Sequence, residues 1–245
     1  MKKGEKVGAI LLAAGASQRM EGVDKAFAPL LGRPLVSYPL QALEASPLVD
    51  GILLVLSEGN WTQGQVLLGE LGLKKMVGAV LGGERRQDSV HRGVEAMEGF
   101  PWLLVHDGAR PLLEGDLIAR ALEAAEETGA AVPVVPATDT VKRVGAQGYV
   151  LETLPREALF CIQTPQACRR DLLIEAYQRI PEDAPDDAFL VERLGHPVKV
   201  FPGSPTNIKV TYPHDLAVAE ALLRGGRWGM GQGSGAKGHG SSLMA

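Results

Sequence analysis

The sequence predicts an α/β fold of three layers, in which helices cover both faces of a mostly parallel, Rossmann-like sheet. Short apolar runs recur along the chain, and stretches with helical spacing separate several of them. The runs predict strands at residues 7–13, 51–56, 76–81, 102–106 and 130–135. Ligands bind such sheets at the carboxyl ends of the strands, so we expect the functional residues in the turns after these runs.

The helices are predicted from apolar residues that recur every three or four positions and so share one face. They cover residues 84–98, 116–128, 169–180 and 187–194, and a last helix runs from Pro213 to Leu223. A proline suits the first turn of that last helix, because its missing N–H would have no partner there. Two further strands are predicted at residues 198–201 and 207–211.

The composition limits the class of protein. The 245 residues are 45% hydrophobic and 22% charged, which is ordinary for a globular protein with one large domain. The formal net charge of −4 disfavours a general nucleic-acid binder, because such proteins are normally basic. No apolar run is long enough for a membrane span or a signal peptide. Two cysteines, Cys161 and Cys168, are too few for a disulfide framework, which favours a cytoplasmic protein.

The first predicted strand ends in a turn of small residues. The chain turns through Ala14, Gly15, Ala16 and Ser17, and the candidate nucleotide-binding residues run from Ala13, at the end of the strand, to Ala16. Small side chains let backbone N–H groups approach a phosphate, and two cations follow at Arg19 and Lys25, so the turn is a candidate polyphosphate site. The alternative is a plain strand-to-helix turn. The chain has no Walker sequence and no G-x-G-x-x-G, which disfavours a P-loop enzyme or a dehydrogenase.

The turns after two later strands carry further candidates. Gly82 and Gly83 either start a helix with a polar first turn or pass over a nucleotide base whose edge Ser89 reads. Asp107 lies at the end of the fourth strand, where its carboxylate could hold Mg²⁺, a cation that prefers oxygen ligands. Alternatively, Asp107 caps the next turn and pairs with Arg110.

Residues 137–162 interrupt the alternation of strands and helices. The alternating runs 140–144 and 149–153 predict a protruding β-hairpin arm. Two strands alone are marginally stable, so we expect the arm to pack against a second subunit in a homodimer. Thr140 and Arg156 could bind a phosphate monoester there, or belong to a solvated polar face.

The domain organisation follows from these elements. Residues 1–224 are predicted to form one domain that includes the arm. Residues 225–245 are rich in glycine and serine with little to bury, which predicts a disordered tail.

Several motifs resemble known families. L-A-A-G-x-x-x-R-M followed by D-K resembles nucleotidyltransferases, whose Arg and Lys grip the triphosphate. H-D-x-A-R-P, D-T-x-K-R, T-P-Q and N-I-K-V-T-x-P follow in that order, and together they resemble the 2-C-methyl-D-erythritol 4-phosphate cytidylyltransferases. The resemblance implies a fold of the nucleotide-diphospho-sugar transferase type, a homodimer and Mg²⁺. It also implies transfer of CMP from CTP to methylerythritol phosphate, with release of pyrophosphate, in the non-mevalonate route to isoprenoids.

The resemblance also implies residue roles. Arg19 and Lys25 would stabilise charge on the α-phosphate, while Lys209 and Arg156 would position the acceptor. The residues that would line the acceptor site are Asp107, Gly108, Arg110, Thr140 and Thr164, with Thr140 and Arg156 contributed by the partner's arm. The acceptor phosphate is largely dianionic at neutral pH and needs no general base, so positioning and cations would carry the catalysis.

Two departures from the family pattern leave alternatives open. The first loop, with Ala16 and with Ala26 after Lys25, is similar to that of molybdenum-cofactor nucleotidyltransferases, and Thr206 replaces a common acidic residue. One alternative is therefore nucleotidyl transfer to ribitol 5-phosphate or molybdopterin. The other is a nucleotide-binding regulatory module without catalysis.

Overall fold

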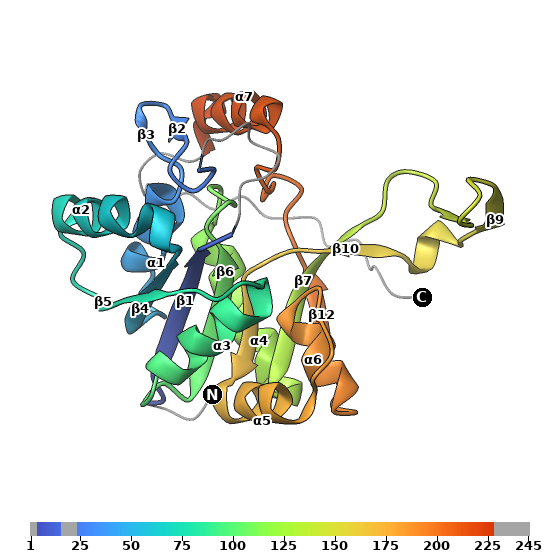
Figure 1. Ribbon diagram of the computed structural model, residues 1–245, viewed down its shortest axis with the longest axis horizontal. Helices are drawn as coiled ribbons and strands as arrows, with labels where there is room; N and C mark the ends of the chain where they lie inside the picture. Colours follow the sequence, from blue (N-terminus) through green and yellow to red (C-terminus); the bar gives the residue numbers. More distant parts are fainter. Residues whose placement is uncertain (1–3, 16–23, 228–245) are drawn as a thin grey trace, which may run out of the picture.

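An eight-stranded sheet lies between two layers of helices in the computed structural model, which describes residues 4–15 and 24–227 (Figure 1). Four adjacent strands are parallel to one another. In sheet order they are β5 (Met76–Leu81), β4 (Gly51–Leu56), β1 (Val7–Ala13) and β6 (Trp102–Asp107). All six residues of β4 and of β6 are buried, as expected for strands covered on both faces.

The other half of the sheet contains both strand directions. β11 (Gln166–Arg169) lies between β6 and β7 (Ala130–Pro136) and is antiparallel to both. β12 (Lys199–Pro202) is parallel to β7 along its other edge, and β10 (Phe160–Ile162) is antiparallel to β7. The prediction of a mostly parallel α/β sheet is therefore confirmed, with β10 and β11 as antiparallel strands that it did not include.

Two hydrophobic cores fill the space between the sheet and its helices. Alternation along β1 sends Ala9 and Leu11 into one core and Ile10 into the other. The first core packs against α1 (Ser37–Ala45), α2 (Trp61–Leu71) and α4 (Gly115–Thr128). The second packs against α3 (Arg86–Ala96), α5 (Arg170–Arg179) and α6 (Asp187–Arg193). The strand ends are thus fixed rigidly, which positions the turns that follow them.

One predicted strand is wrong. Residues 207–211 form no strand, although their sequence alternates like one. Their backbone bonds to a loop instead of a ladder, since Val210 N–H donates to the carbonyl of Ala109 at 2.8 Å. The segment crosses near the end of β6 and leads into α7 (Pro213–Leu222), which continues as a helical turn over Leu223–Arg227. α7 packs near a small hairpin of β2 (Pro29–Leu30) and β3 (Arg33–Pro34).

The predicted hairpin is present as β8 (Lys142–Val144) paired antiparallel with β9 (Val150–Thr153). The hairpin projects from the body at the side of the sheet that carries β7 and β10 (Figure 1). Every residue of β8, β9 and β10 is exposed in the single chain. In the part of the chain that the structure describes, no helix is long and apolar enough to cross a membrane. The predicted tail, apart from 225–227, lies outside the described residues.

Candidate active site

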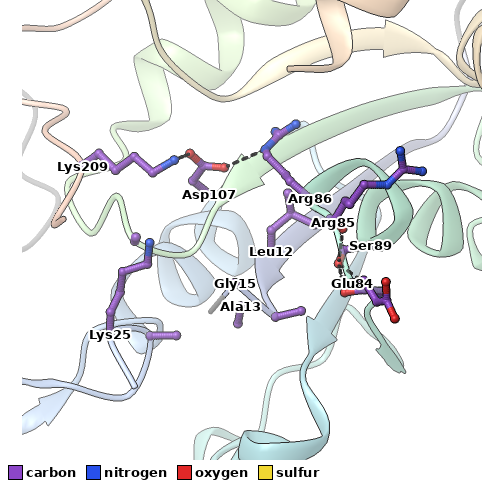
Figure 2. Close-up of a pocket in the computed structure, with 14 residues that line it drawn as sticks. Leu12, Ala13, Gly15, Lys25, Glu84, Arg85, Arg86, Ser89, Asp107 and Lys209 are labelled. Carbon is purple, nitrogen blue, oxygen red and sulfur yellow. Dashed lines mark hydrogen bonds and ion pairs between the residues drawn. The ribbon is translucent and has the colours of Figure 1, made fainter. Parts of the chain in front are cut away.

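A cavity of about 270 Å³ opens at the carboxyl ends of β1 and β6 (Figure 2). Its walls come from the end of β1, the turn between β5 and α3, the end of β6 and two separate lysine segments. The lining residues are Leu12, Ala13, Ala14, Gly15, Lys25, Ala26, Gly83, Glu84, Arg85, Arg86, Ser89, Asp107, Ala109 and Lys209. A cavity at the strand ends is where an α/β sheet of this kind binds its ligand.

Close backbone packing explains two glycines beside the cavity. A Cβ on Gly82 would lie 2.4 Å from the Ala14 Cβ and 2.6 Å from the Ser89 Oγ. A Cβ on Gly108 would lie 2.8 Å from the carbonyl oxygen of Leu12, which accepts the Gly108 N–H at 2.8 Å. Both positions therefore require glycine for the strand-end turns to meet at the observed distance.

Ser89 organises the turn before α3. Its hydroxyl accepts the Gly83 N–H at 3.1 Å and can donate to the Arg85 carbonyl at 3.2 Å. Arg85 itself pairs with Asp88 at 2.7 Å, an exposed pair that closes the same turn. The turn is thus ordered by its own side chains, and its Gly83 and Ser89 reach the cavity wall.

Asp107 lies among three cations. Its Oδ2 is 2.6 Å from the Nζ of Lys209 and 3.9 Å from the Nε of Arg110, and its Oδ1 is 3.5 Å from the Nε of Arg86. Burial alone would raise the pKa of the Asp107 carboxyl, but these positive charges outweigh burial and hold it well below its usual range. Asp107 is therefore ionised, and it gathers cations from three parts of the chain.

Arg86 is a site residue to which the sequence analysis assigned no role. Its guanidinium donates to the Oδ2 of buried Asp187 at 2.9 Å, and the Tyr177 hydroxyl donates to Oδ1 of the same carboxylate at 2.7 Å. Burial opposes its charge, but Asp187 and Asp107 raise the pKa of Arg86 overall. The one available signal was its place in the first turn of a helix after a strand, beside the glycine pair.

His106 and Thr164 fix the backbone of Asp107 from behind. His106 is fully buried, and its Nε2 lies 3.1 Å from the carbonyl of Arg110, so Nε2 carries the proton. Nδ1 therefore accepts from the Thr164 hydroxyl at 3.0 Å, and the Thr164 oxygen accepts the Asp107 N–H at 3.1 Å. Burial lowers the pKa of His106 to about 4, so the ring is neutral at physiological pH.

Asn207 fixes the segment that carries Lys209. The side-chain Nδ2 of Asn207 donates to the Thr164 carbonyl at 2.7 Å. The backbone carbonyl of Asn207 accepts from the Nη1 of Arg110, also at 2.7 Å. The side chain of Gln163 bonds to Ser204, both through its Nε2 and through its Oε1. These hydrogen bonds fix the irregular segment, which brings Lys209 to the cavity.

The structure brings most of the predicted site residues together. Those that line the cavity are Ala13, Ala14, Gly15, Lys25, Gly83, Ser89, Asp107 and Lys209, while Gly82, Gly108, Arg110 and Thr164 lie directly behind its wall. Ala16 and Arg19 lie outside the described residues. Thr140 and Arg156 are exposed on the arm, and no arm residue is among those that line the cavity of the same chain. The arm projects away from the body of the molecule (Figure 1).

The described residues do not fit a Mg²⁺ site built on Asp107. Among residues 4–15 and 24–227, no three His, Cys, Asp or Glu side chains group closely enough to hold a metal ion. Lys209 already contacts one oxygen of Asp107 and Arg86 approaches the other, so a divalent cation there would be repelled by its neighbours. Asp107 instead fits the role of a counter-ion for the three cations.

The fold and the site together define a class of protein. A small-residue turn after the first strand of a Rossmann-like sheet, with lysines and an arginine around the same cavity, is suited to a nucleotide triphosphate and a second anion. Transfer between two phosphate groups depends mainly on positioning and on cations, and this cavity offers both. These features are those of a nucleotidyltransferase.

Comparison with known proteins identifies the family. Residues 7–225 match the family model described as "IspD: 2-C-methyl-D-erythritol 4-phosphate cytidylyltransferase". A curated protein of that name from Dehalococcoides mccartyi (strain CBDB1) is 49% identical over 223 residues, which cover 91% of this chain and 98% of the relative. The chain belongs to the 2-C-methyl-D-erythritol 4-phosphate cytidylyltransferase family.

Solved structures of similar proteins share the fold. The crystal structure of 2-C-methyl-D-erythritol 4-phosphate cytidylyltransferase from Thermus thermophilus has a TM-score of 0.71 and 37% sequence identity, over 88% of this chain and 98% of that one. The 4-diphosphocytidyl-2C-methyl-D-erythritol synthase from Anaerococcus prevotii has a TM-score of 0.81 and 28% identity, over 90% and 97%.

Proposed function

We propose that this chain transfers CMP from CTP to 2-C-methyl-D-erythritol 4-phosphate and releases pyrophosphate. The observation that carries the proposal is the convergence of Lys25, Arg86 and Lys209 on one cavity at the end of β1, in a member of this family. Two anionic reactants need such a group of cations, because their mutual repulsion is the main obstacle to reaction.

The reaction requires little covalent chemistry from the protein. An oxygen of the acceptor phosphate attacks the α-phosphorus of CTP in line, a new P–O bond forms, and the bond to the β-phosphate breaks. Pyrophosphate leaves with the electron pair of that bond. The acceptor phosphate is already deprotonated at neutral pH, so no proton has to be removed from it. Positioning and charge stabilisation by fixed cations therefore supply the catalysis.

The site divides between the two substrates. The nucleotide contacts the small-residue turns, and Lys25 with Arg19 stabilises the α-phosphate. The residues assigned to the nucleotide are Ala13, Ala14, Gly15, Ala16, Gly82, Gly83 and Ser89. The residues assigned to the acceptor are Asp107, Gly108, Arg110, Thr164 and Lys209. Lys209 suits the acceptor phosphate because Asp107 holds its ammonium at 2.6 Å in the wall of the cavity (Figure 2).

Mg²⁺ stays part of the proposal through the family resemblance. We place it on the triphosphate rather than on Asp107, since Mg²⁺ commonly binds substrate phosphates and keeps several waters. When bound, it would neutralise part of the triphosphate charge. The roles of Lys25, Arg86 and Lys209 do not depend on where it binds.

A homodimer through the arm completes the proposed site. The arm exposes apolar side chains that a single chain leaves in water, including Tyr149 at 73%, Val150 at 58% and Leu151 at 58%. Thr140 and Arg156 lie on this arm and would enter the partner's cavity.

Both cysteines are unpaired, which agrees with the cytoplasmic location that the sequence predicts.

Subunit mixing tests the crossed arrangement. Arg156→Ala should mainly weaken acceptor binding, so at methylerythritol phosphate concentrations well below the KM of that variant the homodimers of Lys25→Ala and of Arg156→Ala should each be nearly inactive. A mixed dimer has one site with both residues intact. Co-refolding the two variants is expected to restore about a quarter of wild-type activity. No recovery, with mixed dimers demonstrated by a size tag, would show that Arg156 acts within its own chain or not at all.

A pyrophosphate-release assay tests the function itself. CTP, UTP, ATP and GTP are each combined with methylerythritol phosphate, ribitol 5-phosphate or molybdopterin. We expect release with CTP and methylerythritol phosphate. Release with another acceptor alone would replace the acceptor in the proposal. No release with any pair would favour the regulatory module.

A further inference from the structure

Asn60 lies beneath the cavity without lining it. It ends the single helical turn Glu58–Asn60, which follows β4 and precedes α2. Its side chain is buried, with 2% of the residue exposed. A buried amide with no contact to the ligand cavity needs partners, and the identity of those partners indicates what it does.

Every hydrogen-bonding group of the Asn60 amide is used. Its Oδ1 accepts the Ser57 N–H at 2.9 Å. Its Nδ2 donates both to the carbonyl of Ala13, the last residue of β1, at 2.8 Å and to the Oδ2 of Asp24 at 2.7 Å. One side chain therefore joins three segments of the chain: the end of β1, the turn after β4 and the residue before Lys25.

Asp24 connects Asn60 to the backbone on either side of Lys25. Its second oxygen, Oδ1, accepts the Ala26 N–H at 2.9 Å, so the carboxylate bonds across the lysine to the residue on its far side. The Phe27 N–H donates to the Asp24 carbonyl at 3.1 Å, which closes the turn. The backbone of Lys25 is thus held from both sides, and its side chain forms part of the cavity wall (Figure 2).

We propose that Asn60 is a positioning residue for Lys25: through Asp24 it fixes the lysine backbone relative to the small-residue turn at the end of β1. The inference rests on the proposed function of Lys25 as a cation for the α-phosphate. A lysine has many rotamers, and a shift of about 1 Å at a reacting group can cost roughly 10²-fold in rate. A rigid backbone at Lys25 limits that shift.

The kinetic test uses Asn60→Ala, Asp24→Ala and the double variant. We expect each single variant to lower kcat about tenfold, with less change in the KM of methylerythritol phosphate. The double variant should be no slower than the slower single variant, because the two residues act as one unit. Multiplied losses in the double variant, or an unchanged kcat in Asn60→Ala, would overturn the proposal.

Asp50→Ala is the matched control. The carboxylate of Asp50 accepts the Val7 N–H at 2.8 Å, so it holds the first residue of β1 as Asn60 holds the last. We expect this variant to lose stability while its kcat stays at the wild-type value. If Asp50→Ala and Asn60→Ala lowered kcat equally, the effect would belong to β1 as a whole and not to Lys25.

Hydrogen exchange provides a measurement that does not need turnover. Asn60→Ala should speed amide exchange in the peptide that contains Ala26 and Phe27, whereas Asp50→Ala should not. If the wild type transferred no CMP, the proposed function would fail while this comparison still tested the role of Asn60. Unchanged exchange would refute that role. If Asn60→Ala does not fold, two other variants replace it. Asn60→Asp places a second carboxylate against that of Asp24, and Asp24→Ala removes the Asp24 carboxylate.

Discussion

Lys209 illustrates how one side chain depends on a distant partner. Its ammonium lies 2.6 Å from Asp107, which is separated from it by 102 positions in the sequence. Lys209→Met keeps much of the side-chain length but removes the charge. We expect the KM of methylerythritol phosphate to rise at least tenfold, because a charged hydrogen bond to phosphate is lost, and the KM of CTP to change less than about threefold. Steady-state kinetics with each substrate varied would check this, and a change confined to CTP would contradict the assignment.

Buried His106 makes stability depend on pH. Its pKa falls from 6.5 to about 4 on folding, so between these values the unfolded chain binds a proton that the folded chain does not. Stability should therefore decrease as pH falls from 6.5 to about 4, by about 3 kcal/mol in total. His106→Gln should remove this contribution, which urea unfolding at several pH values would detect.

Exposed His214 provides the control for that measurement. His214→Gln makes the same chemical change at an exposed position of α7, so it controls for the loss of a histidine as such. Equal slopes for His106→Gln and the wild type would contradict the neutral, buried imidazole that holds Thr164.

Gly82 tests the close approach at the nucleotide turn. In Gly82→Ala the new Cβ would overlap Ala14 and Ser89, so the turn must move. We expect the KM of CTP to rise roughly tenfold, about 1.4 kcal/mol of binding. Gly69→Ala, in helix α2 with nothing within 4 Å of the new Cβ, should leave the KM of CTP unchanged. A wild-type KM in Gly82→Ala would show that the turn adapts without cost to binding.

Single residues also show where sequence reasoning reaches its limit. Lys25, Asp107 and Lys209 could be predicted because each stands in a motif at a strand end or in a distinctive segment. Arg86 and Asn60 could not, since their roles come from side chains far away in the sequence: Asp187 for the first, Asp24 and Ala13 for the second. Only the folded chain shows these pairings.

Among the elements, the arm is predicted to form the dimer contact. Val150 on β9 and Val66 on α2 are similarly exposed, at 58% and 57%. Val150→Asp should disrupt the dimer because it places a charge in the apolar arm contact, whereas Val66→Asp should not. Analytical ultracentrifugation of both variants measures the difference. If Val150→Asp sedimented as a dimer like the wild type, the dimer interface would lie elsewhere on the molecule.

The elements that the sequence predicts well are those whose burial dictates their pattern. β1 and β4 have the predicted bounds because apolar runs suit strands covered on both faces. β5 also has the predicted bounds, although it is the edge strand of the sheet and none of its residues is fully buried. Residues 207–211 mimic a strand but bond to loops, and no local pattern distinguishes the two. α1 and α2 were not predicted, and each contains weak helix formers, Pro39 in the first and Gly64 and Gly69 in the second.

The molecule as a whole brings cations from distant segments to one cavity while its net charge is −4. Lys25 follows β1, Arg86 begins α3 and Lys209 lies beyond β12, and the sheet topology together with the loop hydrogen bonds makes them neighbours around the strand ends. An acidic protein can in this way bind two anions, because the local field in the cavity opposes the overall charge.

The rate of CMP transfer within a single turnover tests most directly whether the cations of the cavity carry the catalysis. With enzyme in excess over CTP, rapid-quench measurement separates the chemical step from product release. Lys25→Ala should slow that step on the order of 10²-fold or more, because a cation that stabilises the transition state is lost. A single-turnover rate near that of the wild type would contradict catalysis by the cations of this cavity.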